Sequence, residues 1–404
     1  MAEKMMKDSG IEKLGIIPAD WKTRRLKYIC SSKITNISTD VIKESGRYKV
    51  FGAAGLMGYI ASKEMDQEYI GIVKDGAGAG RMDFYPAESS LLGTMAYIIP
   101  NNNVNIKWLM YVISSLNLGD SVDKTTIPHI YFSEYGNSFV CYPSYSEQAC
   151  IADFLDKKVS EIDAVISKTK ESIEEYKKLK QSIIAEAVTK GLDPNAEMKD
   201  SGIEWIGEIP NNWKINTAFQ LFTQVKNKNL DLQEKNLLSL SYGKIKRKNI
   251  ETTEGLLPES FDGYNIIEAD DIVLRLTDLQ NDHKSLRVGI ATERGIVTSA
   301  YITLRNRSRS LAKYLYYFLH SFDIAKGFYG MGAGVRQGLN WDGLKWLKIL
   351  NPPIDDQIKI VDYLDKISSS FDDLVSKKEN LINQLEQYKK SLIYEYVTGK
   401  KEVA

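Results

Sequence analysis

Residues 198–214 are MKDSGIEWIGEIPNNWK, and residues 6–22 are MKDSGIEKLGIIPADWK. The two stretches are identical at 12 of 17 positions, at an offset of 192 residues. A second match follows in each copy, because residues 146–189 align without gaps to 355–398 and share 17 of 44 residues at an offset of 209. Internal repeats determine the architecture of a chain before any local pattern does. The order is therefore entry segment, insert and helix, repeated once.

The two inserts, residues 23–145 and 215–354, show no convincing similarity to each other. The second insert is 17 residues longer, which is the difference between the offsets 209 and 192. A duplication without functional meaning is one interpretation. We favour another, in which both scaffold copies do the same job and each insert recognises something different, because a shared ligand would tend to keep the inserts alike.

Residues 146–189 and 355–398 are both predicted to form long amphipathic helices. Apolar residues recur in them every three or four positions, and neither stretch contains glycine or proline. Helix-start and helix-stop signals flank them. These signals are a capping box at Ser144 and Glu147, acids at Asp355 and Asp356, and glycines at Gly191 and Gly399.

A helix of this length spans roughly 65 Å at about 1.5 Å per residue and cannot bury its apolar stripe alone. The two helices are each other's obvious partners, so we expect an antiparallel coiled-coil pair that acts as a spacer. Recognition modules several tens of ångströms apart would suit DNA half-sites separated by one to two turns of about 34 Å. The wide stripe also predicts a docking surface for another protein, with candidate contacts at Tyr176, Leu179, Ile183, Tyr388, Leu392 and Tyr396.

Both inserts are predicted to be α+β domains with short strands separated by glycine-rich turns. In the first insert we expect strands at 48–51, 69–73, 95–99 and 137–142, and a helix at 104–118. The second insert repeats this order, with strands near 272–276, 288–291 and 301–304 and a helix at 310–325.

Candidate DNA contacts follow from side-chain chemistry, since arginine and lysine pair with guanine edges or phosphates, and asparagine and glutamine with adenine. Any single one of these residues could instead be an ordinary solvated surface group, so the loops are stronger candidates than the individual residues. In the first insert the candidates are Lys74, Arg81, Lys124, Thr125, Thr126 and His129. In the second insert they are Lys244, Lys246, Arg247, Lys248, Arg336, Gln337 and Asn340.

Bulk properties restrict the class of protein. The 404 residues are 43% hydrophobic and 26% charged, which is typical of a globular chain of two or more domains. We expect no membrane span, no secretory signal and, with three scattered cysteines, a cytoplasmic location. The 53 basic and 53 acidic residues cancel, which counts mildly against DNA binding. Residues 211–350, however, hold 20 basic against 14 acidic residues.

Two motifs imitate an adenine methyltransferase. Residues 351–354, Asn-Pro-Pro-Ile, resemble its Asn-Pro-Pro-aromatic motif, and residues 330–334 resemble its cofactor loop. Ile354 lacks an aromatic face, and about 20 residues between the loops are too few for the intervening βαβ units. We therefore interpret Pro352 and Pro353 as a domain-to-helix junction. Isolated histidines predict no metal site.

The junctions and helices resemble the specificity subunits of type I restriction–modification enzymes. The resemblance is carried by residues 143–148 with 151–155, by residues 352–357 with 360–364, and by the entry segment at 201–213. It implies an α+β fold with two target recognition domains, separated by two long antiparallel coiled-coil helices with pseudo-two-fold symmetry. The predicted division of the chain is 1–145, first recognition domain; 146–190, first spacer helix; 191–354, second recognition domain; and 355–404, second spacer helix.

The resemblance further implies a non-catalytic protein that recognises a bipartite, asymmetric site in double-stranded DNA. Two methyltransferase (modification) subunits and the restriction subunits would be its partners. S-adenosylmethionine, Mg²⁺ and ATP would be bound by those partners and not by this chain. Two alternatives stay open at this point: a self-contained DNA methyltransferase or nuclease, and a coiled-coil protein–protein adaptor.

Overall fold

The computed structural model describes residues 5–116, 118, 128–250, 260–282, 285–331 and 338–403. It divides into two compact units, of which unit 1 comprises residues 1–170 and 379–404 and unit 2 comprises residues 171–378. Each unit contains one insert and one half of each of two long helices. The units therefore do not coincide with segments of the chain taken in order.

The two predicted long helices are present as α3 (Tyr145–Lys190) and α7 (Ile354–Val397). The predicted capping box at the start of α3 is confirmed: Glu147 accepts a hydrogen bond from the Ser144 backbone N–H at 3.0 Å, and the Ser144 hydroxyl accepts one from the Glu147 N–H at 3.4 Å. Both helices end at a glycine in the left-handed region, Gly191 with φ +77° and Gly399 with φ +71°. A side chain would be strained at these positions, which is why glycine terminates both helices.

α3 and α7 pack against each other in both units, and they run antiparallel. In unit 1 the rings of Phe154 and Tyr396 lie 4.5 Å apart, and Lys389 donates to Asp163 at 2.6 Å. In unit 2 the Tyr176 ring lies 6.0 Å from that of Phe371. Residue numbers rise along one helix as they fall along the other, and each helix covers part of the apolar stripe of its partner.

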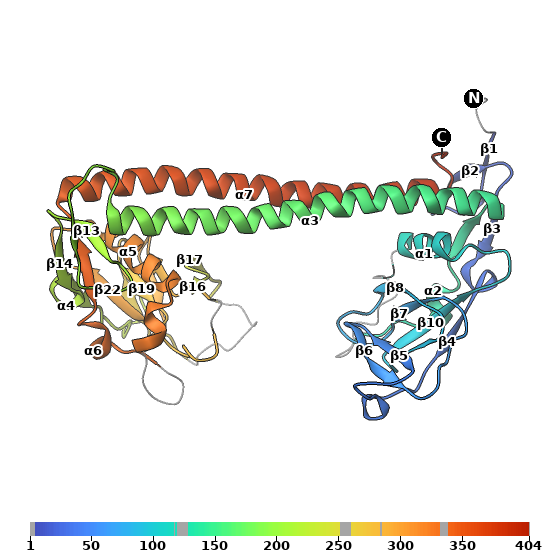
Figure 1. The fold of residues 1–404 in the computed structure, drawn as a ribbon, viewed down its shortest axis with the longest axis horizontal. Coiled ribbons are helices and arrows are strands. Elements are labelled where there is room, and N and C mark those ends of the chain that lie inside the picture. Colours follow the sequence, from blue (N-terminus) through green and yellow to red (C-terminus); the bar gives the residue numbers. More distant parts are fainter. Residues whose placement is uncertain are drawn as a thin grey trace. The chain divides into compact units, whose positions relative to one another are not determined.

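The first insert folds around a four-stranded antiparallel sheet in the order β4-β10-β7-β8 and a three-stranded sheet in the order β6-β5-β9. The predicted helix is α1, which lies against the first part of α3 (Figure 1). The elements of unit 1 are β1 (Met6–Asp8), β2 (Ile16–Pro18), β3 (Lys22–Arg25), η1 (Leu26–Tyr28), β4 (Cys30–Ile34), η2 (Thr39–Val41), β5 (Tyr48–Gly52), β6 (Gly55–Ile60), β7 (Tyr69–Val73), β8 (Met82–Tyr85), β9 (Ser89–Leu91), β10 (Met95–Pro100), α1 (Ile106–Ser115), α2 (Phe132–Tyr135) and β11 (Phe139–Tyr142).

The second insert repeats the four-stranded antiparallel sheet, in the order β15-β22-β19-β20, while its other strands include the pairs β16-β17 and β18-β21. The sequences predicted a common order of strands and helix along the chain, and the structure adds the common order of strands in this sheet. The elements of unit 2 are β12 (Met198–Asp200), β13 (Glu208–Pro210), β14 (Lys214–Thr217), α4 (Ala218–Leu221), β15 (Phe222–Gln224), β16 (Leu238–Ser241), β17 (Lys244–Arg247), β18 (Asn265–Ile267), β19 (Ile272–Leu274), β20 (Val288–Ile290), β21 (Gly295–Val297), β22 (Ile302–Asn306), α5 (Ala312–Ile324), η4 (Gly327–Met331), α6 (Trp341–Leu344) and β23 (Lys348–Asn351).

A buried glutamine joins each insert to the first turn of the helix that follows it. Gln148 accepts a hydrogen bond from the backbone N–H of Asn105 at 2.9 Å and donates one to the Pro143 carbonyl at 3.1 Å. Gln357 repeats the pattern, with the N–H of Leu311 at 2.8 Å and the Pro352 carbonyl at 2.9 Å. The carbonyl contacts are buried and the N–H contacts are partly buried, so each glutamine satisfies backbone groups that have limited access to water.

Two further contacts fix the insert helices on the long helices in the same way. Asp156 of α3 accepts hydrogen bonds from Lys107 at 2.7 Å and Tyr111 at 2.8 Å. Asp365 of α7 accepts them from Lys313 at 2.6 Å and Tyr317 at 2.7 Å. α1 and α5 are therefore equivalent at an offset of 206 residues.

Each entry segment packs against the end of the long helix that closes its unit. In unit 2 Trp213 lies beside Gly191 and donates its indole N–H to Asp356 at 3.2 Å. In unit 1 Trp21 lies beside Gly399 and donates to Glu147 at 3.1 Å. The first entry segment thus packs against the end of α7 in the same way as the second entry segment packs against the end of α3.

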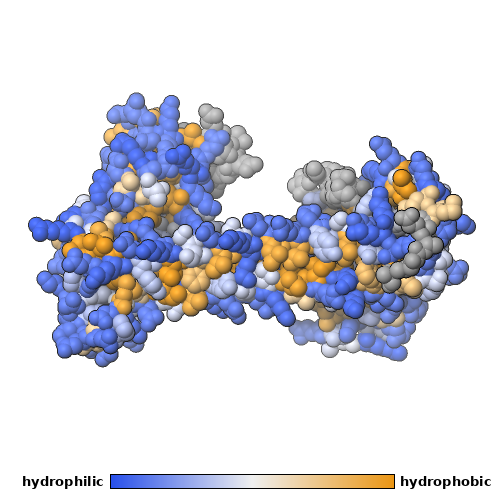
Figure 2. Space-filling view, turned by 90° about the horizontal axis from the view of Figure 1, so that it is seen from above, coloured by the Kyte–Doolittle hydropathy of each residue, from blue (hydrophilic) through white to orange (hydrophobic). Residues whose placement is uncertain are grey.

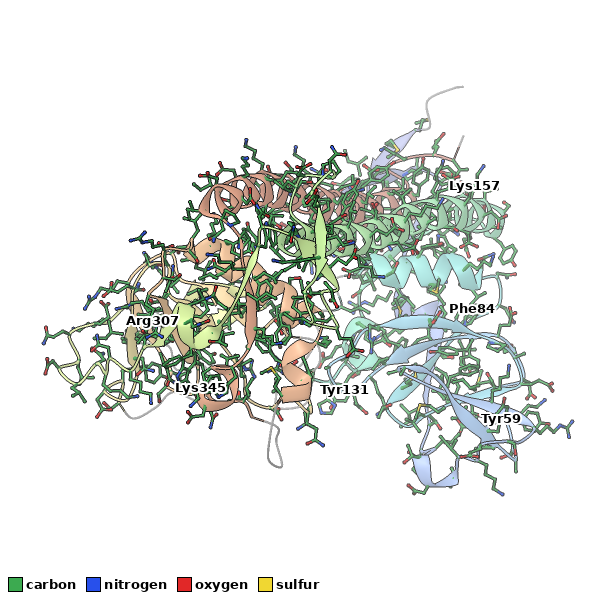
Figure 3. All side chains as sticks on the ribbon, turned by 60° about the vertical axis from the view of Figure 1, so that its left-hand side comes forward. Tyr59, Phe84, Tyr131, Lys157, Arg307 and Lys345 are labelled. Atoms are coloured by element: carbon green, nitrogen blue, oxygen red, sulfur yellow. The ribbon has the colours of Figure 1, made fainter. Side chains whose placement is uncertain are left out.

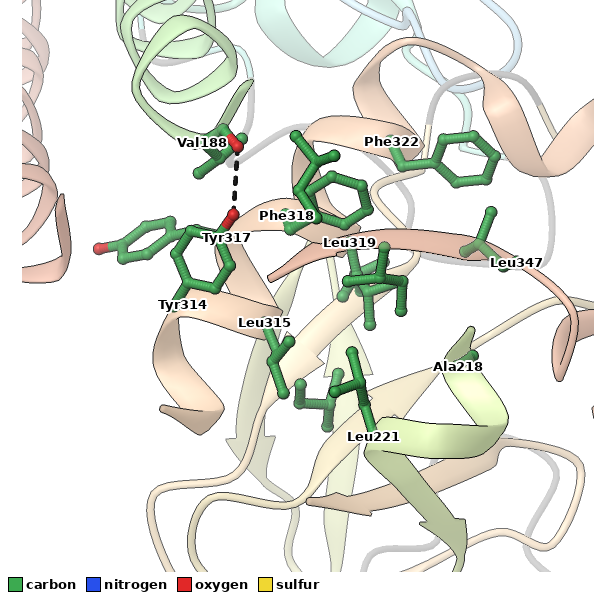
Figure 4. Close-up of a cluster of buried hydrophobic side chains, with 14 of the residues drawn as sticks. Val188, Ala218, Leu221, Tyr314, Leu315, Tyr317, Phe318, Leu319, Phe322 and Leu347 are labelled. Atoms are coloured by element: carbon green, nitrogen blue, oxygen red, sulfur yellow. Dashed lines mark hydrogen bonds between the residues drawn. The ribbon is translucent and has the colours of Figure 1, made fainter. Parts of the chain in front are cut away.

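The core of unit 2 joins the second insert to the end of α3. Tyr314 of α5 is fully buried and donates a hydrogen bond to the Val188 carbonyl at 3.2 Å (Figure 4). Ala218, Leu221 and Leu347 extend the same apolar cluster toward the sheet. Within the described ranges no helix is both long and apolar enough to cross a membrane.

The duplicated glutamines provide a stability test. We expect Gln148→Ala and Gln357→Ala each to lower the free energy of unfolding by about 3 kcal/mol, because each leaves a buried carbonyl and a partly buried backbone N–H without their partner. Thermal unfolding of the full chain, followed by circular dichroism, measures this. Gln384→Ala, on the exposed face of α7, is the matched control and should leave the melting temperature unchanged. Equal effects for all three variants would contradict the assigned role.

Candidate nucleic-acid interface

The glycine-rich loop between β7 and β8 is a tight, partly buried turn in unit 1. Val73 and Arg81 are joined by a backbone hydrogen bond of 2.8 Å at its base, and Gly76 and Gly80 have φ values of +96° and +88°. The Gly76 N–H also donates to the carbonyl of Pro128, which ties the loop to residues 128–130. The chain thus brings two candidate segments of the first insert together.

Asp75 organises the candidate cations of this loop. It forms an ion pair with Lys74 and a hydrogen bond of 2.8 Å with Nδ1 of His129. Partial burial would raise the pKa of Asp75, but the hydrogen bonds from Lys74 and His129 outweigh burial and lower it. Lys74 and His129 therefore lie together, and Arg81 is exposed at the base of the same loop. The candidates Lys124, Thr125 and Thr126 lie outside the described residues.

Tyr131 is an aromatic neighbour of this cluster that the sequence patterns did not single out. Its ring stacks on His129 with a centroid distance of 6.2 Å and an interplanar angle of 19°, and half of the residue is exposed (Figure 3). An exposed ring beside cationic side chains is a surface suited to contact with a base or sugar as well as a phosphate.

In unit 2 the β16–β17 hairpin presents the basic cluster predicted there. Tyr242 and Gly243 form its turn with φ values of +48° and +75°, and the Tyr242 side chain is 73% exposed. Lys244 lies 3.7 Å from Asp372 of α7. Lys246 and Lys248 are exposed.

Arg247, by contrast, is exposed but paired with an acidic residue of the same unit. Its guanidinium makes several hydrogen bonds to Glu293, two of them at 2.7 and 2.9 Å. These hydrogen bonds raise the pKa of Arg247 and lower that of Glu293. A contact from Arg247 to DNA would have to replace this pair, so Lys246 and Lys248 are the stronger candidates.

Asn340 has a structural role at the start of α6. Its side chain accepts a hydrogen bond from the Gly343 N–H at 3.0 Å and caps the helix. The Asn340 Oδ1 already accepts this hydrogen bond, so a contact to adenine through both amide atoms would require the helix cap to open. The candidates Arg336 and Gln337, on the preceding loop, lie outside the described residues.

A second exposed surface of unit 2 combines aromatic and cationic side chains. Trp346 is 65% exposed and its ring lies 6.5 Å from that of Phe219, which is 50% exposed. Lys345 lies over Trp346 at 5.7 Å and Arg307 over Phe219 at 4.8 Å (Figure 3). We call these four residues the Trp346 cluster. Its members come from three separate segments, in α4, directly after β22 and directly after α6, so no local sequence pattern identified it.

Arg287 is a fully buried cation that organises the loop between β19 and β20. Its guanidinium donates to the carbonyls of Arg275 at 3.0 Å and Thr277 at 2.9 Å, and also to that of Asp282. Its backbone N–H donates to Asp323 at 2.5 Å. The Leu276 carbonyl of this loop accepts a backbone hydrogen bond from Leu339 at 2.9 Å. Arg287 therefore also supports the segment that follows the candidates Arg336 and Gln337.

The described residues contain no group of three or more histidine, cysteine or acidic side chains placed to hold a metal ion. His320 of α5 is half-buried, and its loss of hydration lowers its pKa to about 4. Asn351, from the motif that imitates a methyltransferase, instead joins the junction: its Oδ1 accepts from Ser310 at 2.7 Å and from Gln357 at 3.0 Å. The motif is thus part of the link between insert and helix.

The six candidate partner contacts on the long helices differ in exposure. Leu179 is 51% and Tyr388 56% exposed. Tyr176 and Tyr396 pack between the helices, and Ile183 packs against the core of unit 2. Leu392 is buried at 5% exposure, which leaves it no surface for a partner.

The apolar surface of the helices also includes residues that we had not singled out. They are Val165, Leu374 and Leu381, which are 47%, 42% and 42% exposed. Figure 2 looks onto the helices and shows apolar side chains gathered over them in each unit.

Comparison with known proteins places these features in context. A family model described as the type I restriction modification DNA specificity domain matches residues 18–175. A curated relative, the MjaVIII type I restriction enzyme specificity subunit of Methanocaldococcus jannaschii, is 26% identical over 95% of this chain and 93% of its own length. The EcoprrI specificity subunit of Escherichia coli is 28% identical over 28% of this chain and 29% of its own length.

A solved structure from a study of complex assembly and conformational transition of the type I restriction–modification system has a similar fold. Its TM-score is 0.67 at 13% sequence identity, over 95% of this chain and 99% of the solved one. The mixed α/β fold is therefore shared along nearly the full length of both chains.

The Arg287–Asp323 contact offers a test of unit 2 by itself. Burial raises the pKa of Asp323 to about 6, from an ordinary value of 3.8. The folded state then holds a proton that the unfolded chain releases between about pH 4 and pH 6. Stability associated with Asp323 is therefore present at pH 4 and lost as the pH rises through 6, by about 3 kcal/mol at most.

Asp323→Asn removes the titrating group. The variant should therefore have a higher melting temperature than the natural chain at pH 7.5 but not at pH 4.5. Differential scanning calorimetry at the two pH values measures the change. Asp373→Asn, on the exposed surface of α7, is the control and should show the same difference at both values. A pH-independent effect of Asp323→Asn would refute the assignment.

Proposed function

We propose that the chain is a specificity subunit of a type I restriction–modification system, and that its two inserts recognise two different halves of one DNA site. The observation that carries the proposal is the duplicated scaffold with diverged inserts. Glutamine, aspartate and tryptophan contacts hold both inserts in the same way, while the exposed candidate residues of the inserts differ. Equivalent mounting and unlike surfaces are what recognition of an asymmetric, bipartite sequence requires.

The proposed contacts in each insert combine cations with an exposed aromatic ring. In the first insert they are the glycine-rich loop with Arg81 and the neighbouring Tyr131. In the second they are the β16–β17 hairpin with Lys246 and Lys248, beside the exposed Tyr242. Lysine and arginine supply sequence-independent attraction to phosphates, and contacts to base edges supply specificity. The loop containing Arg336 and Gln337 remains a candidate for such contacts.

We further propose that the inserts form two target recognition domains separated by α3 and α7 as an antiparallel coiled coil with pseudo-two-fold symmetry. The domain boundaries are those of the repeat: 1–145 and 191–354 for the recognition domains, 146–190 and 355–404 for the helices. Support comes from the 209-residue offset that relates α3 to α7 and from the antiparallel contacts between them inside each unit.

The partners in this proposal are two methyltransferase subunits, which bind the exposed apolar side chains of the helices, and the restriction subunits. Leu179 corresponds to Tyr388, and Val165 to Leu374, at the 209-residue offset, and all four are exposed. Equivalent apolar positions in both scaffold copies favour two copies of one partner. S-adenosylmethionine, Mg²⁺ and ATP then belong to the partners, and recognition belongs to this chain.

Methylation mapping tests the DNA-binding proposal. The chain together with its methyltransferase subunits should modify adenines in one bipartite, asymmetric sequence, and the chain alone should transfer no methyl group. Lys246→Glu with Lys248→Glu should reduce methylation at least tenfold, because two phosphate or base contacts become repulsive. Tyr131→Ala tests the other insert in the same assay. Methyl transfer by the purified chain alone would favour a self-contained methyltransferase.

Native mass spectrometry tests the partner surface separately from DNA recognition. Leu179→Asp and Tyr388→Asp each place a charge in one proposed apolar contact, which is costly to bury. We expect each single variant to bind one methyltransferase subunit and the double variant to bind none. Lys168→Ala, at an exposed polar position of α3, should keep two. Two bound subunits in the double variant would show that the partners dock elsewhere.

A further inference from the structure

A cavity of about 580 Å³ lies inside unit 1, where the first entry segment, α1, β11 and the end of α7 meet. Leu14, Val112, Leu116 and Val397 supply apolar parts of its wall. Polar groups complete the wall, and the space is partly open to the surface of the unit. Leu118, which also lines the cavity, lies beside Gly80 of the glycine-rich loop between β7 and β8.

The duplication identifies the residues that occupy the same place in unit 2. The entry segments correspond at an offset of 192, so Lys13 corresponds to Trp205. α1 and α5 correspond at an offset of 206, which the shared contacts of Lys107 and Lys313 establish. Val112 therefore corresponds to Phe318, and Leu116 to Phe322.

In unit 2 aromatic rings fill this place. The indole of Trp205 lies 5.7 Å from the ring of Phe318 and 5.3 Å from that of Phe322. Phe318 is fully buried, and only 5% of the surface of Phe322 is exposed (Figure 4). Unit 1 has a lysine, a valine and a leucine at these three positions, so an indole and two phenyl rings are missing from an otherwise equivalent frame.

The strand that forms the opposite wall shows the same trend. At an offset of 209, Ser138 and Cys141 stand where unit 2 has Leu347 and Leu350, both buried in its core. Tyr135 is larger than its counterpart Leu344, and it is buried with the cavity still present beside it. The cavity therefore results from several smaller residues and not from one substitution.

We propose that this cavity binds a planar aromatic molecule of about the size of indole. The second unit provides the template, because an indole ring packs there against two phenyl rings of α5. Asn137, Ser138 and Lys13 line the cavity with polar groups, which suits a ring that carries one N–H or hydroxyl. The Lys13 ammonium is also available for a cation–π contact with such a ring.

Binding of 5-fluoroindole to the full chain, followed by ¹⁹F NMR and calorimetry, tests the proposal. The natural chain should bind one equivalent. A variant with Lys13→Trp, Val112→Phe and Leu116→Phe, which copies the packing of unit 2, should bind at least tenfold more weakly. Val112→Phe alone, which inserts a single ring, should weaken binding and serves if the triple variant does not fold.

Trp205→Ala is the matched positive control, because it opens the equivalent place in unit 2. We expect this variant to bind a second equivalent of 5-fluoroindole. Absence of binding to the natural chain, together with one equivalent bound by Trp205→Ala, would overturn the proposal. Undiminished binding by the folded triple variant would overturn it as well, since the ligand would then occupy another site.

Discussion

The antiparallel packing of α3 on α7 is the constraint on which the rest of the molecule depends. Neither helix can cover its own apolar stripe, and each compact unit takes one half of each helix. Aromatic rings pack between the two helices in each unit, with Phe154 on Tyr396 in unit 1 and Tyr176 on Phe371 in unit 2. Each insert consequently packs against the start of one helix and the end of the other. The glutamine, aspartate and tryptophan hydrogen bonds at these contacts occur in both units.

This shared mounting explains how the inserts can diverge without loss of the scaffold. Gln148 and Gln357 satisfy backbone groups of the insert, and the acids Asp156 and Asp365 hold its helix. These contacts involve none of the exposed loops that we assign to DNA. Surface residues of an insert can therefore change with the recognised sequence, while packing against the long helices is retained. The unequal interiors follow the same logic, since only unit 2 fills its frame with the ring of Trp205.

Much of the fold followed from the sequence because it rests on local signals. The repeat offsets and the 3.6-residue periodicity predicted the starts of both long helices to within one or two residues. Gly191 and Gly399 predicted where the helices end. Short apolar runs located β7 and β10 as well. The common sheet order of the inserts could not be predicted, because strand order depends on contacts between residues distant in sequence.

The candidate site was predictable only in part for the same reason. Lysine and arginine positions are visible in a sequence, but the partners that neutralise them are not, as the pairing of Arg247 with Glu293 46 residues away demonstrates. The helix-capping role of Asn340 and the Trp346 cluster likewise arise from tertiary contacts. The most direct test of the account exchanges residues 26–138 and 218–347 within one chain, followed by methylation mapping with the methyltransferase subunits. Because the two mounts are equivalent, the account predicts an unchanged bipartite sequence with an unchanged gap; a different gap, or loss of methylation by a folded and assembled variant, would contradict it.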